Sequence, residues 1–300
     1  DHGSQEPGSM TPAAWREQRF TAAEGLELYC RIYERRGAAG AGVPTVLCLP
    51  GLTRNSRDFE VLAPHLAARY RVVCPDLRGR GFSARDPQWQ NYQPGTYLAD
   101  LERLMQALDL ERVAIVGTSL GGILGMMLGA TTPERVAGLV LNDIGPEIDP
   151  RGIERIRSYT GMLPPVRTWH EAVMQLRVVY GNAWPDLSEE RWSALARRSY
   201  REDASGVPVL DCDPRIGDAL RAASAAAVSF WPLFARLYSI PMLVIHGALS
   251  DLLSAGTVGR MQREKPDLGC ITVCNRGHVP LLDEPEVLSG LDRFLAQLRS

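Results

Sequence analysis

The stretch Val116-Gly-Thr-Ser-Leu-Gly-Gly122 constrains the fold of this chain more than any other feature. It follows the apolar run Val113–Val116, which is typical of a buried strand, and it leads into the helical pattern of Leu120–Ala130. A serine between glycines at a strand-to-helix turn occupies a sharply bent backbone, where only small neighbours avoid the adjacent strand and helix. The pattern predicts either a plain tight turn or a serine held out as a nucleophile, and other residues must decide between them.

Short apolar runs alternate with helical patterns along most of the chain. Further strand-like runs are Leu26–Arg35, Thr45–Leu49, Arg71–Cys74, Val136–Asn142, Met242–Ile245 and Ile271–Cys274, and further helical patterns are Arg57–Ala68, Thr96–Leu108 and Glu284–Leu298. Continuous apolar strands are expected where helices cover both faces of a parallel sheet. The alternation therefore predicts an α/β fold with a doubly wound, mostly parallel sheet.

The alternation stops between about Glu147 and Tyr238. We therefore predict an α/β core formed by residues 10–146 and 239–300, with residues 147–238 inserted as a helical cap. Four of the six tryptophans, Trp169, Trp184, Trp192 and Trp231, lie in the insertion, where they either form its own core or wall an apolar pocket. Residues 1–9, which precede Met10, have the composition of a vector-derived tag.

Composition and charge narrow the classes of function. The 300 residues carry a formal net charge of -2 and no basic cluster, so neither nucleic acid nor an anionic membrane is an expected partner. No apolar run is long enough to span a membrane, and no signal peptide is evident. The six cysteines form no CxxC pair and no Cys/His cluster at metal-ligand spacing. We expect reduced thiols, no metal site and a cytoplasmic location.

A serine hydroxyl becomes a good nucleophile only when a base accepts its proton, and the chain has five histidines. His278 stands in the segment NRGHVPLLDEPE, between the last predicted strand and the last predicted helix. A loop histidine at the carboxyl edge of a parallel sheet lies where ligands bind. We therefore predict that His278 is the base for Ser119.

An acid must orient the imidazole of that base and stabilise its charged form. Asp251, in HGALSD just past the next-to-last predicted strand, is the favoured candidate, because Ser119, Asp251 and His278 then follow the chain order typical of such serines. Asp143, in LNDIGPE after an earlier strand, is the alternative acid, because that strand end faces the same edge. A turn or a helix cap would also explain an aspartate at position 143.

Acyl transfer also requires N–H donors for the oxyanion that develops on the substrate carbonyl. One expected donor is the backbone N–H of Leu120, at the start of the helix that follows Ser119. The second is the N–H of Leu52, in the loop Pro50-Gly-Leu-Thr-Arg-Asn55 after a predicted strand, where a glycine permits close approach of the backbone.

From about Phe20 to Leu298 the chain resembles the α/β-hydrolase superfamily. Four segments carry the resemblance in order: LCLPGLT, DLRGRGFS, VGTSLGG, and the pair HGALSD with GHVPLLDEPE. The resemblance implies a serine-nucleophile member with a helical cap. The sequence departs from the family pattern in having Pro50 where a histidine usually precedes the glycine of the oxyanion loop.

The expected function is therefore that of a serine hydrolase, of the carboxylesterase or lactonase type, that cleaves a small and largely apolar ester or lactone through an acyl-enzyme. Its partner would be a small-molecule substrate, and it would require no cofactor. Two alternatives remain open. One is a C–C bond hydrolase that acts on a diketone-like ring-cleavage product, and the other is a receptor that binds a small molecule without turnover. The sequence leaves the oligomeric state unassigned.

Overall fold

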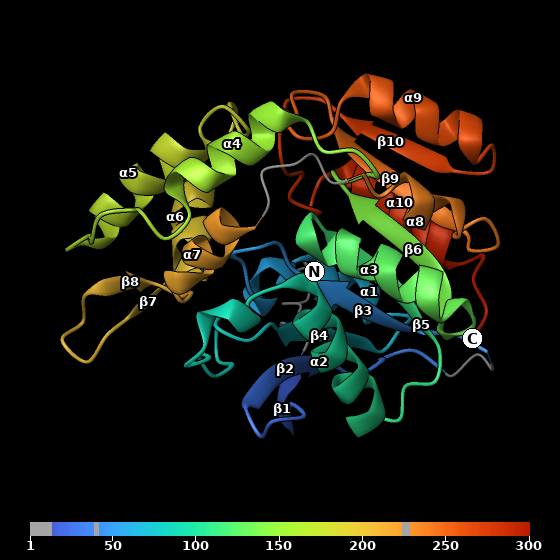
Figure 1. The fold of residues 1–300 in the computed structure, drawn as a ribbon, viewed down its shortest axis with the longest axis horizontal. Helices are drawn as coiled ribbons and strands as arrows, with labels where there is room; N and C mark the ends of the chain where they lie inside the picture. Colours follow the sequence, from blue (N-terminus) through green and yellow to red (C-terminus); the bar gives the residue numbers. More distant parts are fainter. Residues whose placement is uncertain (1–13, 39–41, 224–228) are drawn as a thin grey trace, which may run out of the picture.

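The computed structural model describes residues 14–38, 42–223 and 229–300 (Figure 1). The predicted tag, residues 1–9, lies outside the described residues. The longest helix of the described chain has 14 residues, and none of the helices in these ranges is both long and apolar enough to cross a membrane.

The chain alternates strands with helices from β3 to β6 and again from β9 onward. The strands are β1 (Trp15–Thr21), β2 (Glu27–Tyr33), β3 (Thr45–Leu49), β4 (Val72–Asp76), β5 (Val113–Thr118), β6 (Val136–Asn142), β7 (Tyr200–Glu202), β8 (Pro208–Leu210), β9 (Met242–Gly247) and β10 (Gly269–Val273). The α-helices are α1 (Leu62–Leu66), α2 (Pro94–Ala107), α3 (Leu120–Thr131), α4 (Pro150–Tyr159), α5 (Trp169–Tyr180), α6 (Glu189–Ser199), α7 (Arg215–Ala222), α8 (Trp231–Ala235), α9 (Ala255–Glu264) and α10 (Pro285–Leu295). Short 3₁₀ helices are η1 (Ser56–Phe59), η2 (Trp89–Asn91) and η3 (Pro133–Arg135).

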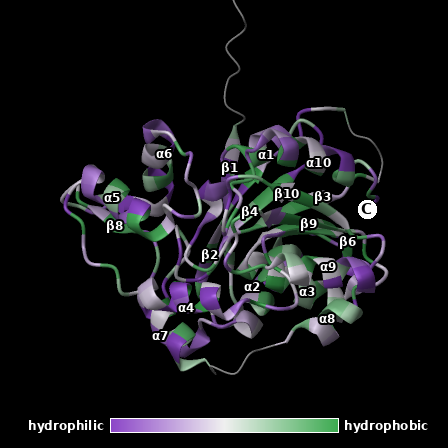
Figure 2. Cartoon of the chain, turned by 90° about the horizontal axis from the view of Figure 1, so that it is seen from above, coloured by the Kyte–Doolittle hydropathy of each residue, from purple (hydrophilic) through white to green (hydrophobic). Residues whose placement is uncertain are grey.

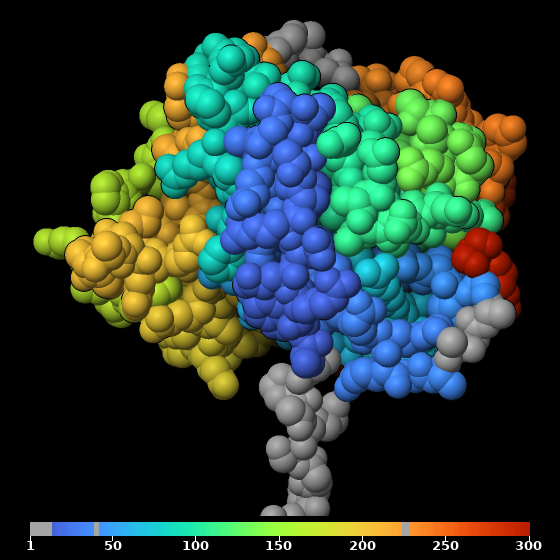
Figure 3. Space-filling view, turned by 90° about the horizontal axis from the view of Figure 1, so that it is seen from below, coloured from blue at the N-terminus to red at the C-terminus, as the bar shows by residue number. Residues whose placement is uncertain are grey.

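Eight strands form one sheet in the order β1-β2-β4-β3-β5-β6-β9-β10. Only β1 with β2 and β2 with β4 pair antiparallel, and the other neighbours are parallel. The predicted α/β fold with a mostly parallel sheet is confirmed. Strand β1 escaped prediction because its segment WREQRFT is largely polar, as suits an edge strand that faces water on most positions. Figure 3 shows this N-terminal edge, in blue, running across one face of the molecule.

Helices cover both faces of the sheet because successive strand residues point to opposite sides. In β3, Leu47 and Leu49 belong to the core beneath α2, α3, α8 and α9, whereas Val46 and Cys48 belong to the core beneath α1 and α10. The central parallel strands β3, β5, β6 and β9 are largely apolar on both faces and lie between helices in Figure 2. This arrangement brings the carboxyl ends of the parallel strands to one edge, which is where ligands bind in open α/β sheets.

The single helix predicted at 57–68 is wrong, because the segment forms η1 followed by the short α1. Asn55 caps η1 by accepting a hydrogen bond from the backbone N–H of Arg57. Pro64 has no N–H, so it cannot make the bond to the carbonyl of residue 60 that a continuous helix would require.

Between β6 and β9 the chain leaves the sheet and forms α4 to α7 with the β7–β8 hairpin, which lie beside the sheet at the left of Figure 1. Trp184 and Trp192 pack with Leu176, Leu195 and other residues in a separate hydrophobic cluster, and Trp169 packs against it. Trp231 differs, since it packs with Phe234 in the core under the sheet. We refer to residues 147–223 of this segment as the cap.

Candidate active site

Ser119 stands between β5 and α3 with φ 51° and ψ -113°, a backbone conformation that non-glycine residues rarely adopt. The turn is closed tightly by its glycines. A Cβ at Gly117 would overlap the backbone of Gly121, and one at Gly121 would overlap the carbonyl of Leu49. The packing explains why this turn requires glycine at both positions, and it holds the Ser119 hydroxyl at the carboxyl edge of the sheet.

His278 lies in the loop between β10 and α10 and is 8% exposed. Its Nε2 is 2.9 Å from the Ser119 hydroxyl oxygen. The cap fixes the loop on both sides of the histidine, because Gly277 donates its N–H to the carbonyl of Ala183 and the indole N–H of Trp184 donates to the carbonyl of Val279. The structure therefore brings Ser119 and His278 together as the sequence predicts.

The carboxylate against His278 is Asp143, which follows β6 and is completely buried. Its Oδ2 is 2.7 Å from His278 Nδ1 and also accepts a hydrogen bond from the Ser250 hydroxyl at 2.6 Å. Its Oδ1 accepts the backbone N–H of Gly247 at 2.8 Å. Asp143 thus accepts two hydrogen bonds from the loop after β9, and its Oδ2 is also within hydrogen-bond distance of the His278 imidazole.

The preference for Asp251 as the acid that contacts His278 is wrong. Asp251 turns toward the cap, where Arg155 of α4 donates to both of its carboxylate oxygens at 2.6 and 3.1 Å. Burial alone would raise the pKa of Asp251, but the hydrogen bonds and charge of Arg155 outweigh it and lower that pKa. The loop after β9 contributes Ser250 to the site instead, a residue that sequence reasoning missed because a single serine in a loop carries no distinctive signal.

The predicted oxyanion loop passes directly over Ser119. A Cβ at Gly51 would lie 3.9 Å from the Ser119 Cβ, which shows how closely this backbone approaches the serine. The Leu52 carbonyl accepts a hydrogen bond from Nε of Arg80 at 2.7 Å, which fixes the position of this loop. Leu120 is the first residue of α3, so its N–H has no acceptor within the helix. The donor roles of Leu52 and Leu120 remain predictions.

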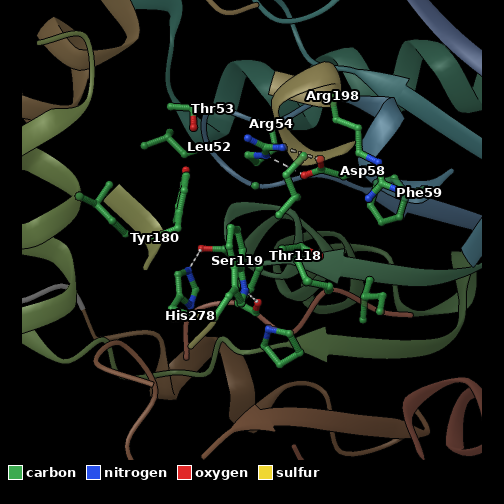
Figure 4. Close-up of a pocket in the computed structure, with 18 of the residues that line it drawn as sticks. Leu52, Thr53, Arg54, Asp58, Phe59, Thr118, Ser119, Tyr180, Arg198 and His278 are labelled. Atoms are coloured by element: carbon green, nitrogen blue, oxygen red, sulfur yellow. Dashed lines mark hydrogen bonds and ion pairs between the residues drawn. The ribbon is translucent and has the colours of Figure 1, made fainter. Parts of the chain in front are cut away.

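A pocket with a cavity volume of about 80 Å³ opens above Ser119 (Figure 4). Its apolar and aromatic walls come from both the core and the cap: Phe59, Ile156, Tyr159, Tyr180, Trp184, Leu195 and the segment 279–282. Burial raises the pKa of Tyr159 well above its usual range, with Tyr180 adding to the effect. Charged side chains occur at Arg54, Asp58 and Arg198, away from His278 in Figure 4.

The described residues contain no group of three or more His, Cys, Asp or Glu side chains that could hold a metal ion. The site consists of the Ser119 hydroxyl, the His278 imidazole and the Asp143 carboxylate, which are linked in that order. Such a series can move a proton from the hydroxyl to the imidazole while the carboxylate stabilises the resulting charge.

Comparison with known proteins shows the family of the chain. The family model described as "alpha/beta hydrolase fold" matches residues 44–156. A 3-hydroxybutyrate-oligomer hydrolase of Cupriavidus necator is 33% identical over 84% of this chain and 88% of its own length. A 2-(acetamidomethylene)succinate hydrolase of Mesorhizobium japonicum is 24% identical over 85% of this chain and 89% of its own.

Among solved structures, the crystal structure of an α/β hydrolase from Novosphingobium aromaticivorans matches with a TM-score of 0.88 and 42% identity. That match covers 95% of this chain and 99% of the other. The likeness therefore extends through core and cap alike. The sheet, the serine turn and the relatives identify this chain as a hydrolase that belongs to the α/β-hydrolase family.

Proposed function

We propose that the protein is a serine hydrolase that cleaves carboxylic esters through an acyl-enzyme, with Ser119 as nucleophile, His278 as base and Asp143 as the acid that orients it. The observation that supports this proposal is the continuous chain from Ser119 to His278 at 2.9 Å and from His278 to Asp143 at 2.7 Å. Both distances allow hydrogen bonds in the directions that proton transfer requires.

In the first step, His278 Nε2 accepts the Ser119 proton while the serine oxygen forms a bond to the ester carbonyl carbon. The negative charge moves to the carbonyl oxygen, which would accept hydrogen bonds from the N–H groups of Leu52 and Leu120. The imidazolium keeps its Nδ1 proton, donates it in a hydrogen bond to Asp143, and passes the Nε2 proton to the leaving alcohol oxygen as the ester bond breaks.

In the second step, a water molecule gives a proton to His278 Nε2 while its oxygen attacks the acyl carbon. The bond between that carbon and the Ser119 oxygen then breaks, the proton returns to the serine oxygen, and the carboxylic acid leaves. Each step uses the same imidazole, first as base and then as acid, and needs no metal or organic cofactor.

The pocket favours short acyl chains or small hydroxy acids, because aromatic side chains of the cap close over Ser119. The relative from Cupriavidus necator is a hydrolase of 3-hydroxybutyrate oligomers, which are linear esters of a hydroxy acid. We therefore propose esters of short hydroxy acids as the first substrate class to examine. A lactone would undergo the same two steps and belongs in the same panel.

The test is labelling with a fluorophosphonate followed by intact-mass measurement and peptide mapping, alongside hydrolysis of p-nitrophenyl butyrate. We expect a single adduct on Ser119 and an initial burst of nitrophenol equal to the amount of enzyme. Ser119→Ala should take no label and lose activity by several orders of magnitude, while its circular dichroism spectrum stays that of the wild type.

An adduct on another residue, or a folded Ser119→Ala variant that retains most of its activity, would rule out this mechanism. Turnover of a vinylogous diketone with no turnover of any ester or lactone would instead assign the C–C hydrolase alternative. Tight binding of a small molecule without hydrolysis or labelling would point to a receptor.

A further inference from the structure

One end of the pocket is charged, although most of its wall is apolar. Arg54 and Asp58 lie there as a closed pair, because Arg54 donates to both carboxylate oxygens of Asp58 at 2.8 and 2.7 Å. The remaining Nη of Arg54 donates to the Ser199 hydroxyl at 2.7 Å. These hydrogen bonds occupy Arg54 and neutralise its charge with that of Asp58, so this pair offers little to a ligand.

Arg198 lines the same end of the pocket with a weaker partner. Its Nε donates to Glu60 at 3.3 Å, and that carboxylate is 42% exposed and also pairs with Arg31 at 3.5 Å. One partly exposed carboxylate therefore serves two guanidinium groups. Within the described residues, the ion pairs formed by Arg31, Arg54 and Arg198 involve two carboxylates, those of Asp58 and Glu60, so these five side chains carry one more positive than negative charge.

The Arg198 side chain is only 14% exposed, so its charge is held in a partly desolvated position. Among the described residues, its hydrogen-bond acceptor is Glu60, which Nε contacts, and neither Nη atom has an acceptor. Its backbone is fixed, because the Arg198 carbonyl accepts a hydrogen bond from the buried Asn55 side chain at 2.8 Å. Arg198 therefore places a partly buried guanidinium in the pocket wall, at the end where Figure 4 also shows Arg54 and Asp58.

We propose that Arg198 is a specificity residue that binds a free carboxylate of the substrate through its two Nη atoms. A planar guanidinium matches a carboxylate with two parallel hydrogen bonds, and such charge-assisted bonds are stronger than neutral ones. The inference rests on the proposed ester hydrolysis and adds a substrate class to it: esters that carry a carboxylate beyond the scissile bond, as the terminal unit of a hydroxy-acid oligomer does.

The experiment compares esters that differ only in charge. On the leaving-group side the pair is 3-(butyryloxy)butyrate and its carboxamide, and on the acyl side it is the p-nitrophenyl esters of succinate and of succinamate. We expect at least one pair to show a preference for the carboxylate of about 10- to 100-fold in kcat/KM, mostly through KM, because the ion pair forms already in the ground state.

Arg198→Gln should reduce that preference to within about threefold, and Arg198→Lys should restore part of it, since lysine keeps the charge but not the fork. The matched control is Arg197→Gln on the adjacent residue of α6, which removes the same charge from a side chain that is 62% exposed and does not line the pocket. It should retain the wild-type preference. Thermal melts of all three variants establish that each is folded.

Equal hydrolysis of carboxylate and carboxamide by the wild type in both pairs would overturn the inference while leaving ester hydrolysis intact. A folded Arg198→Gln variant that keeps the preference for the carboxylate would also overturn the inference. An Arg197→Gln variant that loses the preference equally would do the same, because the preference would then arise from the overall positive charge of the protein and not from Arg198. Hydrolysis of p-nitrophenyl butyrate but of none of the four test esters also contradicts it. If p-nitrophenyl butyrate is not hydrolysed and Ser119 takes no label, the proposed function itself fails.

Discussion

Ser119 and Asp143 share an unusual backbone geometry, with φ of 51° and 54°. Such conformations cost on the order of 1–3 kcal/mol in residues other than glycine, so they persist only where surrounding contacts impose them. At Asp143 the contacts are the backbone bond to the carbonyl of Ile245 at 2.7 Å and the bonds from Gly247 and Ser250. Two strained residues therefore face His278 from neighbouring strand ends, as expected of a functional site.

Replacing each candidate acid by asparagine separates their roles. Asp143→Asn should lower kcat for p-nitrophenyl butyrate by about 10³–10⁴-fold, because an amide cannot stabilise the imidazolium and favours the wrong tautomer of His278. Asp251→Asn should leave kcat within about threefold of wild type. Steady-state kinetics at pH 7.5 on both variants check this, and the reverse order of effects would restore Asp251 as the acid.

At the scale of elements, the loop after β3 is held between the core and the cap. Asn55 donates to the carbonyl of Arg198, Arg57 donates to the carbonyl of Arg197, and Arg57 also pairs with Asp211. From the core side, the buried Arg80 donates to the carbonyls of Leu52 and Arg78, each at 2.7 Å. The loop that carries the expected oxyanion donor therefore takes its position from several elements at once.

Arg80 should act as a positioning residue for that donor. Arg80→Met keeps much of the side-chain volume but removes the bond to the Leu52 carbonyl, so we expect kcat to fall about 10–100-fold with less than threefold change in KM. Arg80→Lys should recover part of kcat, since an ammonium can still reach one carbonyl. A folded Arg80→Met variant with wild-type kcat, or one with a change confined to KM, would disprove this role.

At the scale of the whole molecule, ion pairs join the cap to the core around the pocket. They are Arg57 with Asp211, Arg198 with Glu60, Arg155 with Asp251, Arg191 with Asp283, and Arg276 with Asp186. The pair of Arg57 and Asp211 is largely buried, and the other four each keep a partner that is a third or more exposed, so each of those four contributes little to stability. Together the five pairs define how the cap sits on the core. Cap position and site geometry are therefore coupled, because the cap also supports the His278 loop.

The ion pair of Arg155 and Asp251, which joins the cap to the core, should make the stability of the protein depend on pH. Arg155 lowers the folded-state pKa of Asp251. The contribution of this pair to the free energy of unfolding is therefore complete above the unfolded-state pKa of about 3.9, and it is lost as the pH falls through the folded-state pKa. Asp251→Asn should melt about 0.5–3 °C below wild type from pH 7 to pH 5, and the difference should begin to shrink near pH 4 and vanish as the pH falls through the lowered folded-state pKa of Asp251. Thermal melts across that range test it, and a difference that grows toward acid pH would contradict it.

The sequence by itself determined the features that depend on neighbouring residues. The strand–turn–helix at Ser119 and the parallel sheet follow from apolar periodicity and from glycines that no other residue could replace. The loop position of His278 is likewise readable, because the glycine and proline around it exclude a regular element. These signals lie within a few residues of each site, so no distant contact was needed to recognise them.

Only the tertiary structure decided which aspartate meets His278. Asp143 and Asp251 follow β6 and β9, which are neighbours in the sheet, so their local signals are equivalent. The choice depends on Arg155, which lies 96 residues before Asp251 and draws it toward the cap, while Ser250 and Gly247 hold Asp143 beneath the imidazole. The excess positive charge at Arg198 also depends on the tertiary structure, because Arg31 and Arg198, which are far apart in the sequence, pair with the same carboxylate of Glu60 only once the chain has folded.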